Sequence, residues 1–143
     1  MPDQPQRLLA FDFGLRQIGC ASGLVLTGTA TPQQIFKARE GQPNWDEVEQ
    51  FIRHWKPDAI LVGLPLNMDG TESQLSGHAR KFANRLHGRT GLRILMVDER
   101  LSSREAKALA ADDRRISRTE VDHYAAALIM ETWFSDPGIA QPI

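Results

Sequence analysis

The apolar stretch from Leu8 to Gly14 constrains this chain most, because a single carboxylate, Asp12, interrupts its run of hydrophobic residues. Burying an unpaired carboxylate costs several kcal/mol, so such a group is normally paired, protonated or bound to a metal. Asp12 is therefore either a functional group or a strand-end residue that reaches solvent. Two later acids, Glu99 and Asp122, have similar apolar neighbours. We expect the three carboxylates to meet around a divalent metal.

The size and composition suit one compact domain covering residues 1–143. Hydrophobic residues make up 41% of the chain and charged residues 24%, as in ordinary soluble globular proteins. No apolar run approaches the length that spans a bilayer, and the first residues lack the pattern of a secretory signal. The one cysteine, Cys20, excludes an internal disulfide and a cysteine-based zinc site. We expect a cytoplasmic protein without membrane association.

The charge distribution is more informative than the net charge of −1. Residues 80–118 contain eleven Lys and Arg against five Asp and Glu. Such a local excess of positive charge is what a phosphate-binding face needs. The alternative is that these residues lie on separate, solvated helix faces.

Hydrophobic periodicity and turn residues predict five strands and four helices. The predicted strands cover residues 8–14, 18–23, 30–37, 59–64 and 93–97. The predicted helices run from an N-cap at Asn44 to residue 55, from a capping box of Thr71 and Gln74 to the glycines at 88 and 91, from a capping box of Ser102 and Glu105, and over residues 121–134.

The order of these elements predicts an α/β fold with a mixed five-stranded sheet flanked by helices. The first three strands have short connections, which favours an antiparallel meander. The last two strands each follow a helix, which favours parallel pairing through right-handed crossovers. The tail, residues 135–143, contains two prolines and a glycine and is expected to fray.

This topology can bring the three acids together. Ligand sites in open α/β sheets form at the carboxyl ends of parallel strands, where Asp12 and Glu99 are expected. Asp122 lies early in the last helix, where the small residues Ala125 and Ala126 allow close approach to the sheet. Three adjacent carboxylates repel one another unless cations neutralise them. Mg²⁺ and Mn²⁺ prefer carboxylate oxygens, and two such ions about 3.5–4 Å apart promote phosphodiester hydrolysis.

Four stretches carry a resemblance to a known family. They are LAFDFG at 9–14 followed by Ile18-Gly19, VGLPLNMDGT at 62–71, DERLSS at 98–103, and Val121-Asp122 with Ala125-Ala126. In this order they resemble the YqgF family, the bacterial Holliday-junction-resolvase-like family regarded as the pre-16S rRNA nucleases. The resemblance implies a ribonuclease-H-like fold, divalent-metal phosphodiester cleavage and a role in maturing the 5′ end of 16S rRNA. It also implies that Asp12, Glu99 and Asp122 bind the metal.

The chain departs from the family pattern just before the last acid. Members often have a Lys-Gly dipeptide there, preceded by a longer loop that contains glycine, whereas this chain has ISRTE at 116–120. Arg118 could replace the lysine, although arginine and lysine present their donors differently. The departure concerns substrate selection by this loop rather than the metal site.

Five residues are candidates for substrate contact, namely Arg16, Asn67, Arg100, Arg104 and Arg118. Three of them have an alternative interpretation. Asn67 could instead stabilise its own turn, Arg16 could simply face solvent, and Arg100 could pair with Asp98.

The residues favour a nuclease that uses Mg²⁺ or Mn²⁺, with two ions, on structured nucleic acid. That its substrate is the 5′ end of pre-16S rRNA is implied by the family resemblance alone. Its partners would be nucleic acid and ribosomal particles, and a monomer is favoured over a homodimer because rRNA trimming requires no two-fold symmetry.

A Holliday-junction resolvase acting on branched DNA is the first alternative. A non-catalytic RNA-binding or ribosome-binding module is the second. An ATPase of the actin and sugar-kinase type also carries an Asp-x-Gly loop, as Asp12 and Gly14 do, but it needs two lobes.

Overall fold

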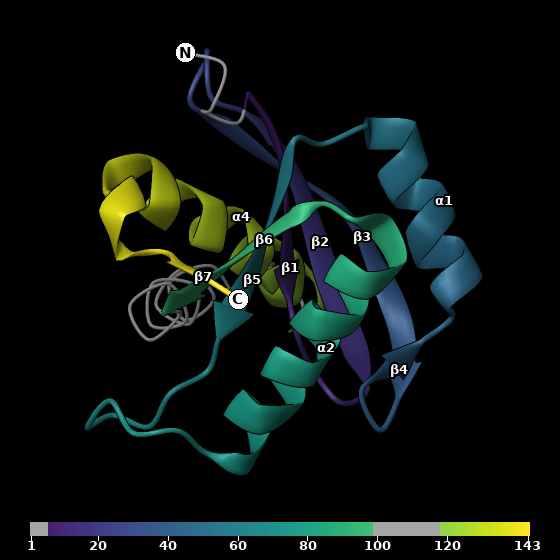
Figure 1. Ribbon diagram of the computed structural model, residues 1–143, viewed down its shortest axis with the longest axis vertical. Helices are drawn as coiled ribbons and strands as arrows, with labels where there is room; N and C mark the ends of the chain where they lie inside the picture. The colour runs from purple at the N-terminus through teal and green to yellow at the C-terminus, as the bar shows by residue number, and fades with distance from the viewer. Residues whose placement is uncertain (1–5, 99–117) are drawn as a thin grey trace.

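The computed structural model describes residues 6–98 and 118–143, with only the backbone described at 118–123 and 139. Figure 1 shows a sheet with helices on both faces. Its elements are β1 (Arg7–Asp12), β2 (Gln17–Leu24), β3 (Thr29–Arg39), β4 (Gln42–Pro43), α1 (Trp45–Trp55), β5 (Ala59–Leu64), α2 (Gln74–Thr90), β6 (Arg93–Asp98), α4 (Arg118–Ser135), η1 (Pro137–Ile139) and β7 (Gln141–Pro142). Within the described ranges, no helix is both long and apolar enough to cross a membrane.

The sheet has the strand order β4-β3-β2-β1-β5-β6-β7. Strands β1, β2 and β3 form the predicted antiparallel meander, and β1, β5 and β6 pair in parallel. The prediction of a mixed sheet built from these five strands is confirmed. The two-residue strands β4 and β7 extend it at either edge and were not predicted.

The carboxyl-terminal tail is ordered against the sheet, whereas we expected it to fray. Gln141 and Pro142 pair antiparallel with Met96 and Leu95, and the Ile143 amide donates to the Ile94 carbonyl. Without the tail, β6 would be an edge strand with unpaired backbone groups, which attract a further strand. An edge position also tolerates the missing N–H of Pro142.

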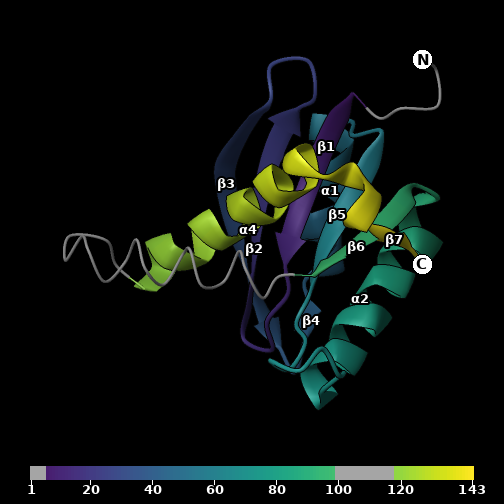
Figure 2. The same ribbon diagram turned by 90° about the vertical axis from the view of Figure 1, so that its left-hand side faces the viewer.

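Side-chain alternation along β1 divides the core into two layers. Leu9 and Phe11 belong to the cluster beneath α1 and α2, whereas Leu8 and Ala10 belong to the cluster that includes Ile129 of α4. Figure 2 shows α4 crossing the face of the sheet opposite to α1 and α2. A residue's position in β1 therefore decides which helices it faces.

Side-chain caps fix where α1 and α2 begin. Asn44 caps α1 as predicted, accepting hydrogen bonds from the amides of Asp46 and Glu47. The predicted capping box of Thr71 and Gln74 is wrong, because α2 is capped by Ser73 in a reciprocal capping box with Ser76.

Thr71 belongs instead to the turn before the helix. Its hydroxyl donates to the Asp69 carboxylate at 2.6 Å, so this side chain is not available to cap α2.

Small residues allow α4 to lie close to the sheet. Ala126 and Ala127 form a buried cluster with Ala21 of β2. At Gly23, an added Cβ would lie 1.9 Å from Sδ of Met130 and 2.7 Å from the Thr29 carbonyl oxygen. The contact therefore depends on the absence of a side chain at position 23.

We predict that Gly23→Ala lowers the free energy of unfolding by about 1–3 kcal/mol, the usual cost of overpacking a core. Equilibrium urea unfolding measures the change. The matched control is Gly88→Ala on α2, where an added Cβ meets nothing within 4 Å, and it should not destabilise the protein. Equal stabilities of the Gly23→Ala variant and the wild type would contradict this account of the α4 contact.

Asp58 fixes the start of β1. Its Oδ2 atom accepts hydrogen bonds from the amides of Arg7 and Gln6, each at 2.8 Å, and its own amide donates to the Arg7 carbonyl. The hydrogen bond from Arg7, followed by that from Gln6, holds the pKa of the Asp58 carboxyl below its ordinary value. The ionised carboxylate is thus the form that the folded state prefers.

We predict that Asp58→Asn lowers Tm at neutral pH and that its effect shrinks as the pH falls below about 3.9. Because the folded-state pKa lies below the unfolded one, the stabilisation is present above the unfolded pKa and is lost as the pH falls through the folded pKa. Thermal unfolding of both proteins from pH 7 to pH 2.5 measures the difference. A constant difference in Tm across this range would contradict the role of the charge.

Candidate active site

The three parallel strands end at one edge of the sheet, which we call the carboxyl edge. β1 ends at Asp12 and β6 ends at Asp98, with β5 between them. The register aligns Phe11 with Val62 and Val62 with Met96, so the strands end almost level. Neighbouring strands lie about 4.8 Å apart, so the ends of β1 and β6 are about 10 Å apart. Such an edge is where open α/β sheets bind ligands.

Asp12 is half-buried in the middle of this edge, between β2 and β5. It lies two residues after Ala10 and four after Leu8, the β1 residues that pack towards α4. Strand alternation therefore directs the Asp12 side chain to the α4 face of the sheet.

The turn after Asp12 is tight and fixed in place. An added Cβ at Gly14 would lie 2.5 Å from the carbonyl oxygen of Gln17, so the turn needs glycine there. The Leu15 carbonyl accepts from the Gly41 amide at 2.9 Å, and the Arg16 carbonyl accepts from the Ala38 amide at 2.8 Å. Arg16 is exposed beside the end of β1. In the described ranges, no hydrogen bond or ion pair of its guanidinium is found, so it can meet an incoming phosphate.

The loop that follows β5 at the same edge is held in shape by its own side chains. The Asn67 amide group donates to the Thr71 hydroxyl at 3.0 Å, and the Asn67 backbone amide donates to the Thr71 carbonyl at 2.8 Å. The Asp69 carboxylate accepts from the Thr71 amide at 2.9 Å. These bonds support the turn-forming alternative for Asn67.

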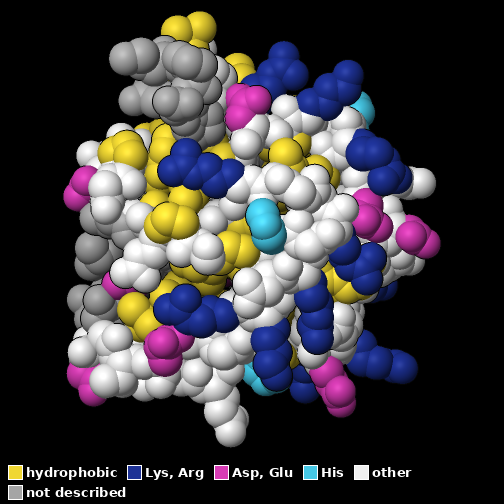
Figure 3. Space-filling model, viewed as in Figure 1, with side chains coloured by type: hydrophobic (Ala, Val, Ile, Leu, Met, Phe, Trp, Pro, Cys, Tyr) yellow, Lys and Arg dark blue, Asp and Glu magenta, His cyan; other side chains and the backbone are white. Residues whose placement is uncertain are grey.

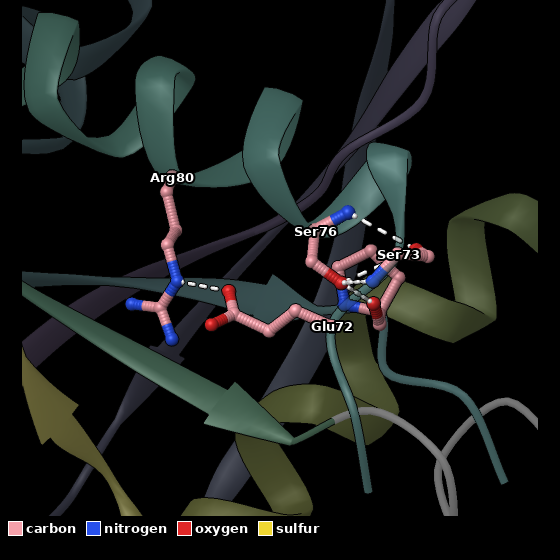
Figure 4. A network of polar contacts seen from close by, with 5 residues as sticks. Glu72, Ser73, Ser76 and Arg80 are labelled. Carbon is pink, nitrogen blue, oxygen red and sulfur yellow. Dashed lines mark hydrogen bonds and ion pairs between the residues drawn. The ribbon is translucent and has the colours of Figure 1, made fainter.

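A second set of bonds fastens this loop to α2. The Ser76 hydroxyl donates to the Pro65 carbonyl. Glu72, before the helix, forms an ion pair with Arg80, which lies one helical turn after Ser76. Figure 4 shows Glu72, Ser73, Ser76 and Arg80 together at the start of the helix. The loop is therefore a fixed wall of the carboxyl edge.

α4 approaches the carboxyl edge with its amino-terminal end. Met130 contacts Gly23, which pairs with Leu8, and Ala126 packs with Ala21, which pairs with Ala10. Moving back along α4 thus leads towards the carboxyl edge, while the helix crosses obliquely from β1 towards β3 (Figure 2). Asp122 lies one further turn back, and Arg118 is the first residue of the helix.

Several predicted site residues lie outside the part of the chain that the structure describes. The side chains of Asp122 and Arg118 are not described, and Glu99, Arg100 and Arg104 lie in the undescribed segment 99–117. Among the residues whose side chains are described, no three of His, Cys, Asp and Glu form a group that could hold a metal ion. The predicted cluster of three carboxylates therefore stays a prediction.

The basic segment 80–118 does not form one continuous face with Asp12 over its described part. Arg80, Lys81, Arg85 and Arg89 lie on α2, across the sheet from α4. A charge count along the sequence could not separate the two faces, because the crossover helix before β6 and the helix after it cover opposite sides of the sheet (Figure 2).

The family described as "RuvX: Holliday junction resolvase" matches residues 6–136. The chain belongs to this family. A RuvX-family relative in Edwardsiella ictaluri, named "Putative pre-16S rRNA nuclease", is 53% identical over 92% of this chain and 96% of its own length. A relative with the same name in Mannheimia succiniciproducens is 51% identical over 88% and 92%. The predicted resemblance to the YqgF family is confirmed.

Solved structures support the fold of this RuvX-family chain. RuvC of T. thermophilus in complex with a Holliday junction substrate has a TM-score of 0.56 and 17% identity, covering 96% of this chain and 99% of its own. Fowlpox virus resolvase with Holliday junction DNA has a TM-score of 0.55 and 13% identity, covering 93% and 99%. The predicted ribonuclease-H-like fold is confirmed.

Proposed function

We propose that this protein is a divalent-metal-dependent endonuclease that cleaves phosphodiester bonds of structured RNA at the carboxyl edge. The observation that carries the proposal is the position of Asp12, a half-buried carboxylate that ends the central strand on the face covered by α4. The family supports the same chemistry, because it is described as a resolvase family and its curated relatives carry a nuclease name.

Asp122 and Glu99 are the proposed partners of Asp12. Four residues of α4, from Ala126 back to Asp122, cover about 6 Å. Two residues of β1, from Ala10 to Asp12, cover about 6.6 Å. Since Ala126 packs against the neighbour of Ala10, each acid lies about 6–7 Å along its own element from this contact, and we expect both on the α4 face near the carboxyl edge.

We expect Glu99 near the end of β6 because of its position in the sequence. It follows Asp98, the last residue of β6, and consecutive Cα atoms are about 3.8 Å apart. In the proposed site the three carboxylates come from the ends of two strands and the beginning of one helix.

This donor set fits Mg²⁺ or Mn²⁺, which bind carboxylate oxygens and keep part of their water. A bound pair of such ions supplies activation of a water nucleophile and stabilisation of the leaving oxygen. Asp12, Glu99 and Asp122 would hold the ions, while the rigid turn after Asp12 and the loop after β5 would orient the substrate. The buried Cys20 is no alternative nucleophile, because burial raises the pKa of its thiol.

The proposed substrate is the 5′ end of pre-16S rRNA, because the relatives are named as pre-16S rRNA nucleases. Arg16, exposed beside Asp12, would contact the backbone, together with Arg100, Arg104 and Arg118, and Asn67 would act through the loop it stabilises. We place the enzyme in the cytoplasm, as a monomer that meets its substrate within ribosomal particles. Branched DNA is the second candidate substrate, because the family description names Holliday junctions.

We predict that Asp12→Asn lowers the rate of cleavage at least about a hundredfold, equivalent to ~2.7 kcal/mol of transition-state stabilisation. The assay uses an RNA that spans the 5′ leader and mature 16S sequence, with a four-way DNA junction in parallel, in Mg²⁺ or Mn²⁺. The matched control is Asp136→Asn, which removes an exposed carboxylate beyond the other end of α4 and should leave the rate unchanged.

Each outcome of this assay has a defined meaning. Cleavage of the junction but not of the RNA would assign the site to branched DNA. Equal activity of the wild type and Asp12→Asn would indicate a contaminating nuclease and would remove the proposal. RNA binding without cleavage by the wild type would favour the non-catalytic module.

A further inference from the structure

α2 has an unusual charge composition for an exposed helix. Its sequence, QLSGHARKFANRLHGRT, contains four Lys or Arg, two His and no Asp or Glu. One face packs on the sheet through Ala79, Phe82, Ala83 and Leu86. Lys81, Arg85 and Arg89 are exposed, so the charged side chains on the outer face of the helix are all basic.

The cations of α2 differ in how far they are neutralised. Arg80 pairs with Glu72, and Arg89 lies 3.6 Å from a Glu49 oxygen and stacks 4.5 Å above the centre of the Trp45 ring. Over the part of the chain that the structure describes, Lys81 and Arg85 have no hydrogen-bonding or ion-pair partner. Two cations one turn apart in the middle of the helix are therefore not neutralised by any described residue.

The basic surface continues onto α1. A cleft of about 320 Å³ lies between the carboxyl-terminal ends of α1 and α2, and Arg53, Lys56 and Arg89 line it. Glu49 is the one acid among its lining residues. Figure 3 shows Lys and Arg side chains over α2 and α1 on this face of the molecule, with Asp and Glu side chains among them over α1. We call Lys81, Arg85, Arg89, Arg53 and Lys56 the α2 basic surface.

Two exposed glycines lie on the same stripe as these cations. Gly77 and Gly88 precede and follow Lys81 at helical spacing, and a Cβ added at either meets nothing within 4 Å. Glycine weakens a helix relative to alanine, and no contact within the described residues requires it here. Glycine does permit a ligand to approach the backbone closely.

We propose that the α2 basic surface binds the phosphate backbone of structured RNA outside the cleaved segment. Charge selects this occupant, because a phosphate backbone releases counterions when Lys and Arg neutralise it. A second copy of this chain would instead place the same cations opposite one another. The inference rests on the proposed function for the identity of the polymer, but it concerns a surface on the other face of the sheet from α4.

The position of α2 also suits binding of RNA that continues to the carboxyl edge. The helix begins directly after the loop that forms a wall of the carboxyl edge, and it extends away from that edge for about 25 Å. RNA held along α2 could therefore continue to the site of cleavage. The surface would anchor the substrate and would not take part in the chemistry.

The test compares Lys81→Gln/Arg85→Gln with the control Arg7→Gln/Arg93→Gln, which removes equal charge from exposed residues at the starts of β1 and β6. Binding of the pre-16S 5′-leader RNA is measured without divalent ions, over a range of salt concentrations. The α2 variant should lose about tenfold or more in affinity at low salt and reduce the slope of log K against log salt by about 1.5–2. The control should keep most of the wild-type affinity and slope.

Cleavage assays separate this inference from the proposed function. On the long RNA the α2 variant should show a raised KM with an unchanged kcat, and on a minimal RNA around the cleaved bond it should match the wild type. Failure of the wild type to cleave either RNA would remove the proposed function. Normal cleavage with equal RNA binding by the α2 variant and the wild type would overturn the inference alone.

Gly77→Ala provides a second variant in which stability and binding should move in opposite directions. A purely structural role predicts an unchanged or raised Tm and unchanged binding. Close approach of RNA predicts the same Tm result together with weaker binding.

Sedimentation of Lys81→Gln/Arg85→Gln adds a further check. A changed oligomeric state with unaltered RNA binding would mark α2 as an interface between copies and would overturn the proposal.

Discussion

The close contact between α4 and the sheet determines where the proposed chemistry can occur. Ala126 and Ala127 pack on Ala21, and Gly23 leaves room for Met130. Larger residues at these positions would lift the helix from β2 and move its amino-terminal end away from Asp12. Small side chains in this contact bury little apolar area each, but they let α4 lie close enough to the sheet for the proposed site to include Asp122. The proposed site depends on this distance more than on any single hydrogen bond.

The sequence predicted those elements whose signals are local and repeated. β1 is an apolar run that ends on Asp12, β5 is a continuous apolar run, and Asn44 caps α1 because no competing cap residue precedes the helix. The start of α2 was mispredicted because Thr71 and Ser73 are both capable caps, and only the turn around Asp69 decides between them. The pairing of β7 with β6 involves two residues, too few for any periodic signal.

Part of the candidate site was predictable from the sequence, again because its signal is local. An acid inside an apolar strand is a strong signal, and strand order and alternation place Asp12 at the carboxyl edge on the α4 face. Linear charge could not reveal that the basic residues of α2 lie on the face of the sheet opposite α4, because that position follows from the crossover topology. A protein that cleaves a long polymer can use both faces, one for the reaction and one to hold the chain that leads to it.

The account can be tested most directly by locating Mn²⁺ through its paramagnetic broadening of backbone amide NMR signals. We predict that substoichiometric Mn²⁺ broadens amides near Asp12 and in the first turns of α4, while amides of the hairpin between β2 and β3 stay sharp. Asp12→Asn should abolish this pattern without unfolding the protein. Broadening centred elsewhere, or the same pattern in wild type and Asp12→Asn, would contradict a shared metal site at the carboxyl edge.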